Sequence, residues 1–163
     1  MLWAGLVLWL HLLAAIFWVG GQIFLIAVVL PVLRQSLPTE ERAHFAGQIG
    51  RRFALPSALA LGLLLVTGPL NAMAHGLSWA IVWHTEWGHV LLIKVTLVLA
   101  VLALTAAHGA FYGRKLEQLA RSAGTDAAVL RQRLQRHSVR LSAVNLGLNL
   151  AIVGLAAWLA TLP

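Results

Sequence analysis

The sequence contains no cysteine, and only two of its 163 residues are methionine. Without cysteine, disulfides, thiolate metal sites and thiol redox chemistry are excluded. The two methionines, Met1 and Met73, do not form the methionine-rich ladder expected of a dedicated Cu(I) channel. Capture of Cu(II) by histidine is not excluded, and the chain has seven histidines.

Charged residues are also scarce, at 10% of the chain against 60% hydrophobic residues. A soluble domain has about a quarter of its residues charged. The apolar residues come in long uncharged blocks, and a block of about 18 or more crosses a bilayer. The chain is therefore predicted to be an all-α integral membrane protein. The N-terminal block is too long for a signal peptide and lacks a basic segment before it, so it is predicted to be a retained helix.

Four transmembrane helices are predicted within a single membrane domain that covers residues 1–163. Their approximate bounds are 4–30, 53–74, 88–112 and 141–162. The first helix is expected to end at Pro31, where the ring interrupts helical hydrogen bonding.

Two polar connections join these helices, at residues 31–52 and 113–140. In the first connection a helix is expected to begin with Thr39 as its N-cap and to lie along the membrane surface. In the second connection a turn is expected at residues 122–125, between two helical pieces.

The net charge of +7 indicates topology rather than nucleic-acid binding, because arginine and lysine gather in the two polar connections. The loop at residues 75–87 carries neither. Basic loops stay in the cytoplasm. The chain is therefore expected to be a multi-pass protein of the bacterial inner membrane, with cytoplasmic basic connections and periplasmic termini.

Each predicted span carries polar residues at helical spacing, which face the protein interior because lipid-facing polar groups are costly. The stripes are His11, Ala15, Trp18 and Gln22; Thr67, Asn71 and His75; Glu86, His89 and Thr96, with Lys94, Thr105 and Tyr112 on a second face; and Ser142, Asn145 and Asn149. The pattern predicts a four-transmembrane-helix bundle with a polar or ligand-filled interior.

Depth divides the histidines into two groups. At 1.5 Å per residue, His11 lies about 10 Å below the outer surface. The outer group is His11, His75, His84 and His89, and the inner group is His44, His108 and His137. His84, His44 and His137 are expected to be interfacial. His11 and His108 are too far apart in depth to share one ligand, whereas His11, His75 and His89 can share one.

Haem b is the first ligand that suits the outer group, because helix bundles commonly hold haem between imidazoles. His11 would be one axial ligand, and the other would be His89 or, next, His75. The slot would be shaped by Trp18, Gly20 and Gly21. The propionates would contact Lys94, Asn71 or an arginine. Lys94 has an equal alternative, in which its amine extends toward the membrane surface.

Copper is the second ligand that suits these histidines, because imidazole binds it well. His108 is a further candidate metal ligand on the inner side. A third interpretation has no cofactor, since intramembrane polar residues often only join neighbouring helices. The chain would then be a structural or assembly protein.

Three short segments resemble the copper resistance D (CopD) family of bacterial inner-membrane proteins. They are residues 9–21 (WLHLLAAIFWVGG), Arg51-Arg52-Phe53 followed by Thr67-Gly68 and Asn71, and residues 88–94 (GHVLLIK). The resemblance implies a role in copper uptake or resistance.

Several of the same positions are also similar to the HemJ-type membrane protoporphyrinogen oxidases, which bind haem b. The shared positions are His11, Trp18, Gly20, residues 88–94 and His108-Gly109 before Arg114. The N-E-x-P element of that family is absent, and Val144-Asn145-Leu146 stands in its place.

The leading hypothesis from the sequence is a haem b protein of the b-type cytochrome kind, active in electron transfer or redox chemistry and expected to form a homodimer. Its redox partner is unknown, and no catalytic residue is assigned. The alternative is a copper-binding or copper-transport protein without porphyrin.

Overall fold

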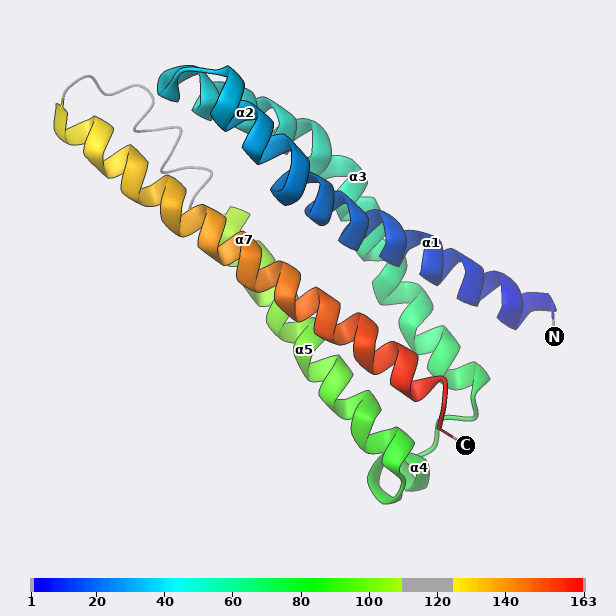
Figure 1. Cartoon of the computed structure of the whole chain (residues 1–163). Coiled ribbons are helices and arrows are strands. Elements are labelled where there is room, and N and C mark those ends of the chain that lie inside the picture. Colours follow the sequence, from blue (N-terminus) through cyan, green and yellow to red (C-terminus); the bar gives the residue numbers. More distant parts are fainter. Residues whose placement is uncertain (1, 110–124, 163) are drawn as a thin grey trace. The chain divides into compact units, whose positions relative to one another are not determined.

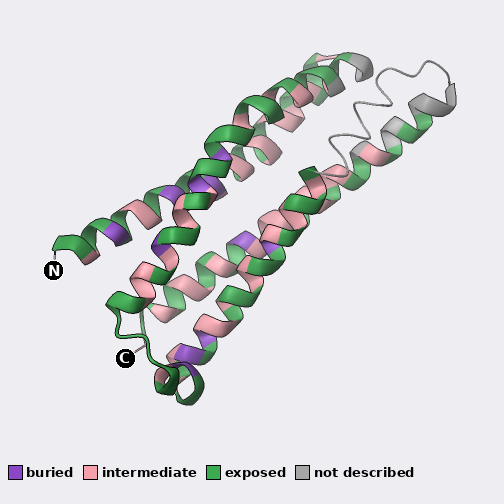
Figure 2. Ribbon diagram, turned by 180° about the vertical axis from the view of Figure 1, so that it is seen from behind, coloured by how far each residue is buried: buried purple, intermediate pink, exposed green. Residues whose placement is uncertain are grey.

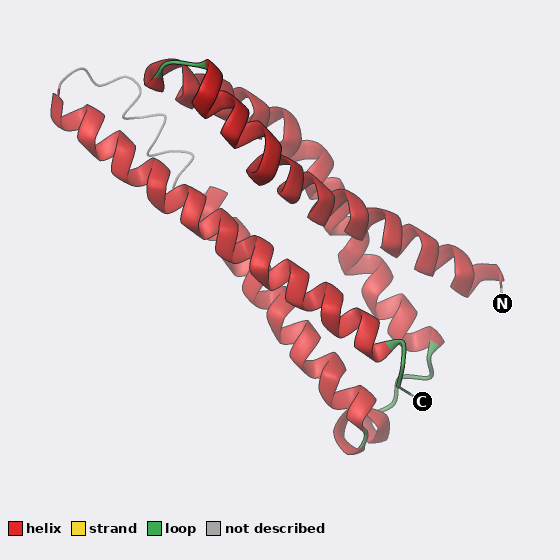
Figure 3. Cartoon of the chain, viewed as in Figure 1, coloured by secondary structure: helices red, strands yellow, loops and turns green. Residues whose placement is uncertain are grey.

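The computed structural model describes residues 2–109 and 125–162. All secondary structure among them is helical (Figure 3). In chain order the elements are α1 (Leu2–Phe24), the π-helix η1 (Leu25–Val29), α2 (Leu30–Ser36), α3 (Thr39–Ala74), α4 (Trp79–His84), α5 (Glu86–His108) and α7 (Thr125–Leu159). Four stretches are long and apolar enough to cross a membrane: Leu2–Ser36, His44–Ala74, Glu86–His108 and Arg136–Leu159. The prediction of an all-α fold with four transmembrane helices is confirmed.

Most of the apolar surface of these helices is not buried inside the protein. At most 17% of the residues in the apolar window of each stretch are buried. Large side chains such as Leu55 and Ile16 are about two-thirds exposed, and exposed residues cover much of each helix (Figure 2). Since a soluble protein rarely exposes such continuous apolar area, this surface fits the acyl chains of a bilayer.

The chain divides into two compact units, Met1–Trp79 and Ala80–Pro163. In the first unit α1 and α3 pack side by side in opposite directions (Figure 1). The buried residues of this contact are Val7, Ala14 and Trp18 on α1 and Ser57, Ala60 and Thr67 on α3. Their spacing places them on one face of each helix, and the small residues among them allow the two backbones to approach closely.

The first transmembrane helix does not end at Pro31, as the sequence predicted. Helical backbone continues through α2 to Ser36 because the turn before the proline widens into η1. There the Leu30 amide donates to the Leu25 carbonyl, five residues earlier. Such a π-turn makes room for a ring that would clash in a regular α-helix.

The helix after this hairpin is one continuous element, α3, rather than a surface helix followed by a separate span. It begins at Thr39 with Pro38 as its N-cap, so Thr39 is the first helical residue and not the cap that the sequence predicted. Its 36 residues extend about 54 Å at 1.5 Å per residue, well beyond a hydrocarbon core of about 30 Å. The polar N-terminal turns therefore belong to the same helix as the transmembrane segment and continue it beyond the hydrocarbon core.

A glycine turn ends α3 and leads into α4. Gly76 has a φ of +75°, a conformation that glycine adopts without strain. Its amide donates to the Met73 carbonyl, and the Leu77 amide donates to the Ala72 carbonyl. This pair of hydrogen bonds satisfies the last carbonyls of α3.

In the second unit α4 packs against the start of α5, and α5 pairs with α7. Thr85 caps α5 by accepting a 3.0 Å hydrogen bond from the Gly88 amide. Gly88 is buried, and a Cβ at this position would overlap the Ile81 and Val82 carbonyls. The close approach of α4 to α5 therefore requires a glycine here.

The last helix, α7, is longer than the predicted fourth span because it runs unbroken from Thr125 to Leu159. The predicted amphipathic piece and the predicted span are thus one helix. Most of the predicted turn at 122–125 and the end of the predicted third span, 110–112, lie outside the described residues.

Candidate functional site

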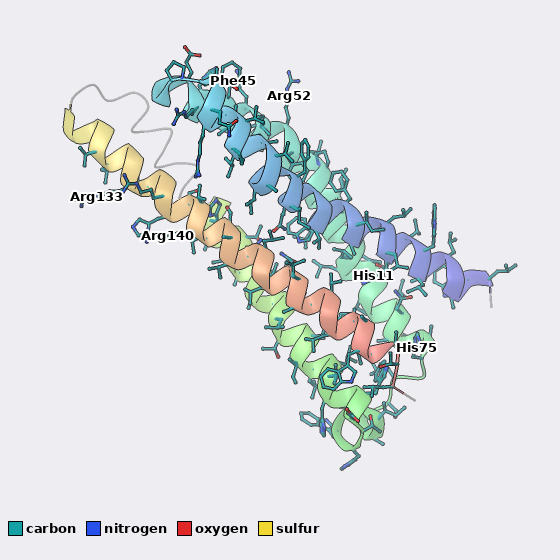
Figure 4. All side chains as sticks on the ribbon, viewed as in Figure 1. His11, Phe45, Arg52, His75, Arg133 and Arg140 are labelled. Carbon is teal, nitrogen blue, oxygen red and sulfur yellow. The ribbon has the colours of Figure 1, made fainter. Side chains whose placement is uncertain are left out.

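His11 lies on the packed face of α1, four residues after Val7 and three before Ala14, which are both buried. Its Nδ1 is 2.7 Å from the hydroxyl oxygen of Thr67 on α3. Thr67 is only 3% exposed. Figure 4 shows His11 where α1 runs alongside α3. The imidazole is therefore held at the contact between the two helices.

The hydrogen bonds of Thr67 determine which nitrogen of His11 carries the proton. The Thr67 hydroxyl donates its single hydrogen to the Leu63 carbonyl over 2.6 Å. It therefore acts as an acceptor toward His11, and Nδ1–H is the donor. In the neutral imidazole the lone pair is then on Nε2, the atom through which a ring in this tautomer coordinates a metal.

Beyond His11, toward the Phe24 end of α1, aromatic rings line the contact between α1 and α3. Trp18 is buried, and Phe17 stacks on Phe53 with 5.6 Å between ring centroids. A Cβ on Gly21 would overlap the Phe53 ring, so the absence of a side chain at Gly21 allows this ring to pack closely. Gly20 is exposed, with no atom of the described residues within 4 Å of a Cβ built on it.

Toward its C-terminal end, α3 continues the polar stripe with Asn71 and His75. The Asn71 Nδ2 atom is buried and has no hydrogen-bond partner within the described part of the chain. His75 is exposed, and its Nδ1 donates to the Asn71 carbonyl over 2.8 Å. The His11 imidazole and the buried Asn71 donor thus lie within one helix pair.

The other predicted site residues belong to the second unit. His89 is exposed, and its Nε2 donates to the Trp83 carbonyl over 3.1 Å. His108 contacts the Ser138 hydroxyl across α5 and α7 at 3.3 Å. Lys94 is half-buried, on the face of α5 that also carries Val90.

The residues that the structure describes contain no group of three or more His, Asp or Glu side chains that could hold a metal ion. The structure joins His11 to Thr67, a contact that the sequence analysis did not predict. The polar spacing of Thr67 and Asn71 signalled their shared face, but nothing in the sequence paired either with α1. A ligand shared by His11, His75 and His89 stays a prediction.

Comparison with known proteins identifies a family for most of the chain. The family model described as "Copper resistance protein D" (CopD) matches residues 47–159. This match includes Thr67, Asn71, His75 and all of α5, whereas α1 with His11 precedes it. No solved structure matches the chain.

Two curated bacterial proteins are similar to parts of the chain. An uncharacterized protein of Aquifex aeolicus is 43% identical over 67 residues, which is 40% of this chain and 46% of that protein. The copper transport protein CutJ of Bacillus subtilis is 34% identical over 99 residues, which is 61% of this chain and 17% of CutJ. The chain therefore spans less than half the length of either relative. The resemblance to HemJ-type oxidases gains no support from these matches.

The family match covers well over half of the 163 residues, and the four apolar helices agree with a membrane location. This chain is a multi-pass membrane protein that belongs to the CopD family.

Proposed function

We propose that this chain binds copper at His11 and takes part in moving copper across the membrane. The family description and the name of the Bacillus relative both concern copper. Neither mentions haem, so the comparisons favour the copper alternative over the haem b hypothesis. The similarity to CutJ supports copper as the transported ion, and the residues of this chain indicate how it is bound.

The observation that carries the proposal is the hydrogen bond from His11 Nδ1 to Thr67. It holds the ring on the packed face of a membrane-spanning helix with the lone pair on Nε2. Metal-bound histidines are ordinarily fixed in this way by a bond from the other ring nitrogen.

Copper would reach His11 from the end of the helix pair that carries His75. That imidazole is exposed at the outer end of α3, and its Nδ1–H donates to a carbonyl, so its lone pair is also on Nε2. The basic residues of the first unit lie at the opposite end, with Arg42, Arg51 and Arg52 in the first half of α3. By the positive-inside rule, His75 is then periplasmic, and copper moves inward from His75 to His11.

Haem b would also bind through the His11 imidazole, and it is therefore the main alternative to copper. The buried contact of α1 with α3 at Val7, Ala14 and Trp18 leaves no slot for a porphyrin between these two helices. A haem on His11 would have to lie outside this contact.

One preparation separates these functions. The protein is purified in detergent, its visible spectrum is recorded before and after dithionite, and its copper content is measured after loading and gel filtration. Retained copper without a Soret band supports the proposal. A Soret band with sharp bands on reduction would establish haem b instead, and a protein with neither would point to a structural role.

A further inference from the structure

We propose that the copper bound at His11 is the divalent ion, and that it carries an oxygen ligand that accepts a hydrogen bond from Asn71 Nδ2. The oxygen belongs to a water molecule or a small carboxylate. This inference rests on the proposed function, for which it names the oxidation state of the cargo and one further contact.

The starting point is the buried amide nitrogen of Asn71. Within the described residues its two hydrogens have no acceptor. A buried donor without an acceptor is costly, and such groups in folded proteins usually mark the place of a water, an ion or a ligand. The missing partner of an N–H donor is an acceptor atom, and oxygen is the acceptor that water and carboxylates provide.

Asn71 is close enough to His11 for both to serve one ligand. It follows Thr67 by four residues, so the two side chains lie on the same face of α3, about 6 Å apart along the axis. The Thr67 hydroxyl contacts His11 directly. The Asn71 amide is therefore one helical turn to the outer side of this hydrogen bond, the side from which copper arrives in the proposed direction.

The donor set around this position fits Cu(II) better than Cu(I). Cu(I) is selected by thiolate and thioether ligands, whereas imidazole together with oxygen suits tetragonal Cu(II). The chain has no cysteine. Met73 is 67% exposed and thus lies away from the packed face that holds Thr67. Nitrogen and oxygen are the ligand atoms that remain.

The test titrates the full-length protein in detergent with Cu(II) in a non-coordinating buffer, and separately with Cu(I) under anaerobic reduction, against a competing chelator in each case. Asn71→Leu removes the donor, and Thr96→Val is the matched control because Thr96 is exposed and bonds only the Leu92 carbonyl of its own helix. We expect preferential binding of Cu(II), an affinity lowered about tenfold in Asn71→Leu, and no change in Thr96→Val.

Electron paramagnetic resonance of the Cu(II) complex identifies the oxygen. Broadening of the copper signal in water enriched in oxygen-17, lost in Asn71→Leu, identifies a bound water. Tighter binding on addition of acetate, without that broadening, identifies a carboxylate. Binding of Cu(I) alone, or a Cu(II) signal and affinity unchanged in Asn71→Leu, overturns the inference and leaves the proposed function standing. If neither ion binds, the proposed function itself fails.

Discussion

The Nδ1 atom of His11 on α1 lies 2.7 Å from the hydroxyl oxygen of Thr67 on α3, and the same hydroxyl donates to the Leu63 carbonyl. A single threonine thus joins two membrane helices and determines the tautomer of the proposed copper ligand. The role of Thr67 in positioning His11 can be separated from its role in packing.

Replacing Thr67 by valine keeps the shape of the side chain but removes the acceptor for His11 Nδ1–H. We expect copper affinity to fall by about tenfold, as for other groups that orient a metal-bound imidazole. Thr67→Ser keeps the hydroxyl and should stay near the wild type. Copper titration of both variants measures the difference, and equal affinities in the two would show that the hydrogen bond does not matter for copper.

The packing of α1 on α3 predicts opposite outcomes for two adjacent glycines. In Gly21→Ala the new methyl group meets the Phe53 ring, which is stacked on Phe17, and we expect a loss of about 1–3 kcal/mol as in other overpacked cores. In Gly20→Ala the methyl group meets no described atom, so stability should be unchanged or slightly raised. Thermal unfolding in detergent compares the two, and a Gly20→Ala variant as unstable as Gly21→Ala would contradict the packing.

Gly88 should be even less tolerant of a side chain. In Gly88→Ala the new methyl group meets backbone carbonyls of Ile81 and Val82, which cannot move without displacing α4. We therefore expect a larger drop in unfolding temperature than for Gly21→Ala. The control is Gly147→Ala on α7, where a Cβ has no described atom within 4 Å; it should unfold at the wild-type temperature.

The proposed topology can be mapped without background because the chain has no cysteine. A single cysteine in Ser78→Cys, between α3 and α4, should react in intact cells with a reagent that does not cross the inner membrane. A single cysteine in Arg133→Cys, on the exposed surface of α7, should react only after the membrane is permeabilised. The reverse pattern would place the termini in the cytoplasm.

The sequence was sufficient to predict the helical fold, because long uncharged blocks have few alternatives to membrane helices. It misplaced helix ends for a local reason. Pro31 predicts the end of a helix, yet the helical backbone continues past it through the π-turn η1. The polar residues after Thr39 read as a surface helix, yet nothing in them breaks the backbone before α3 enters the apolar part.

The candidate site was only partly predictable. Helical spacing placed His11 on an inward face and put Thr67 and Asn71 on one face of their own helix. The pairing of His11 with Thr67 depends on the register of α1 against α3, which is decided by the small residues Ala14 and Ala60 and the stacked Phe17 and Phe53. That register depends on both helices together and cannot be predicted from the sequence of either one alone.

Equilibrium copper binding to His11→Ala is the sharpest test of His11 as the copper ligand. Wild-type protein, His11→Ala and His44→Ala are loaded with copper in detergent and titrated with a competing chelator. His44 is the control because it is exposed near the start of α3, where it contacts Gln48. We expect His11→Ala to lose the tight copper site and His44→Ala to keep it. A His11→Ala variant that binds copper as tightly as the wild type would contradict copper binding at His11.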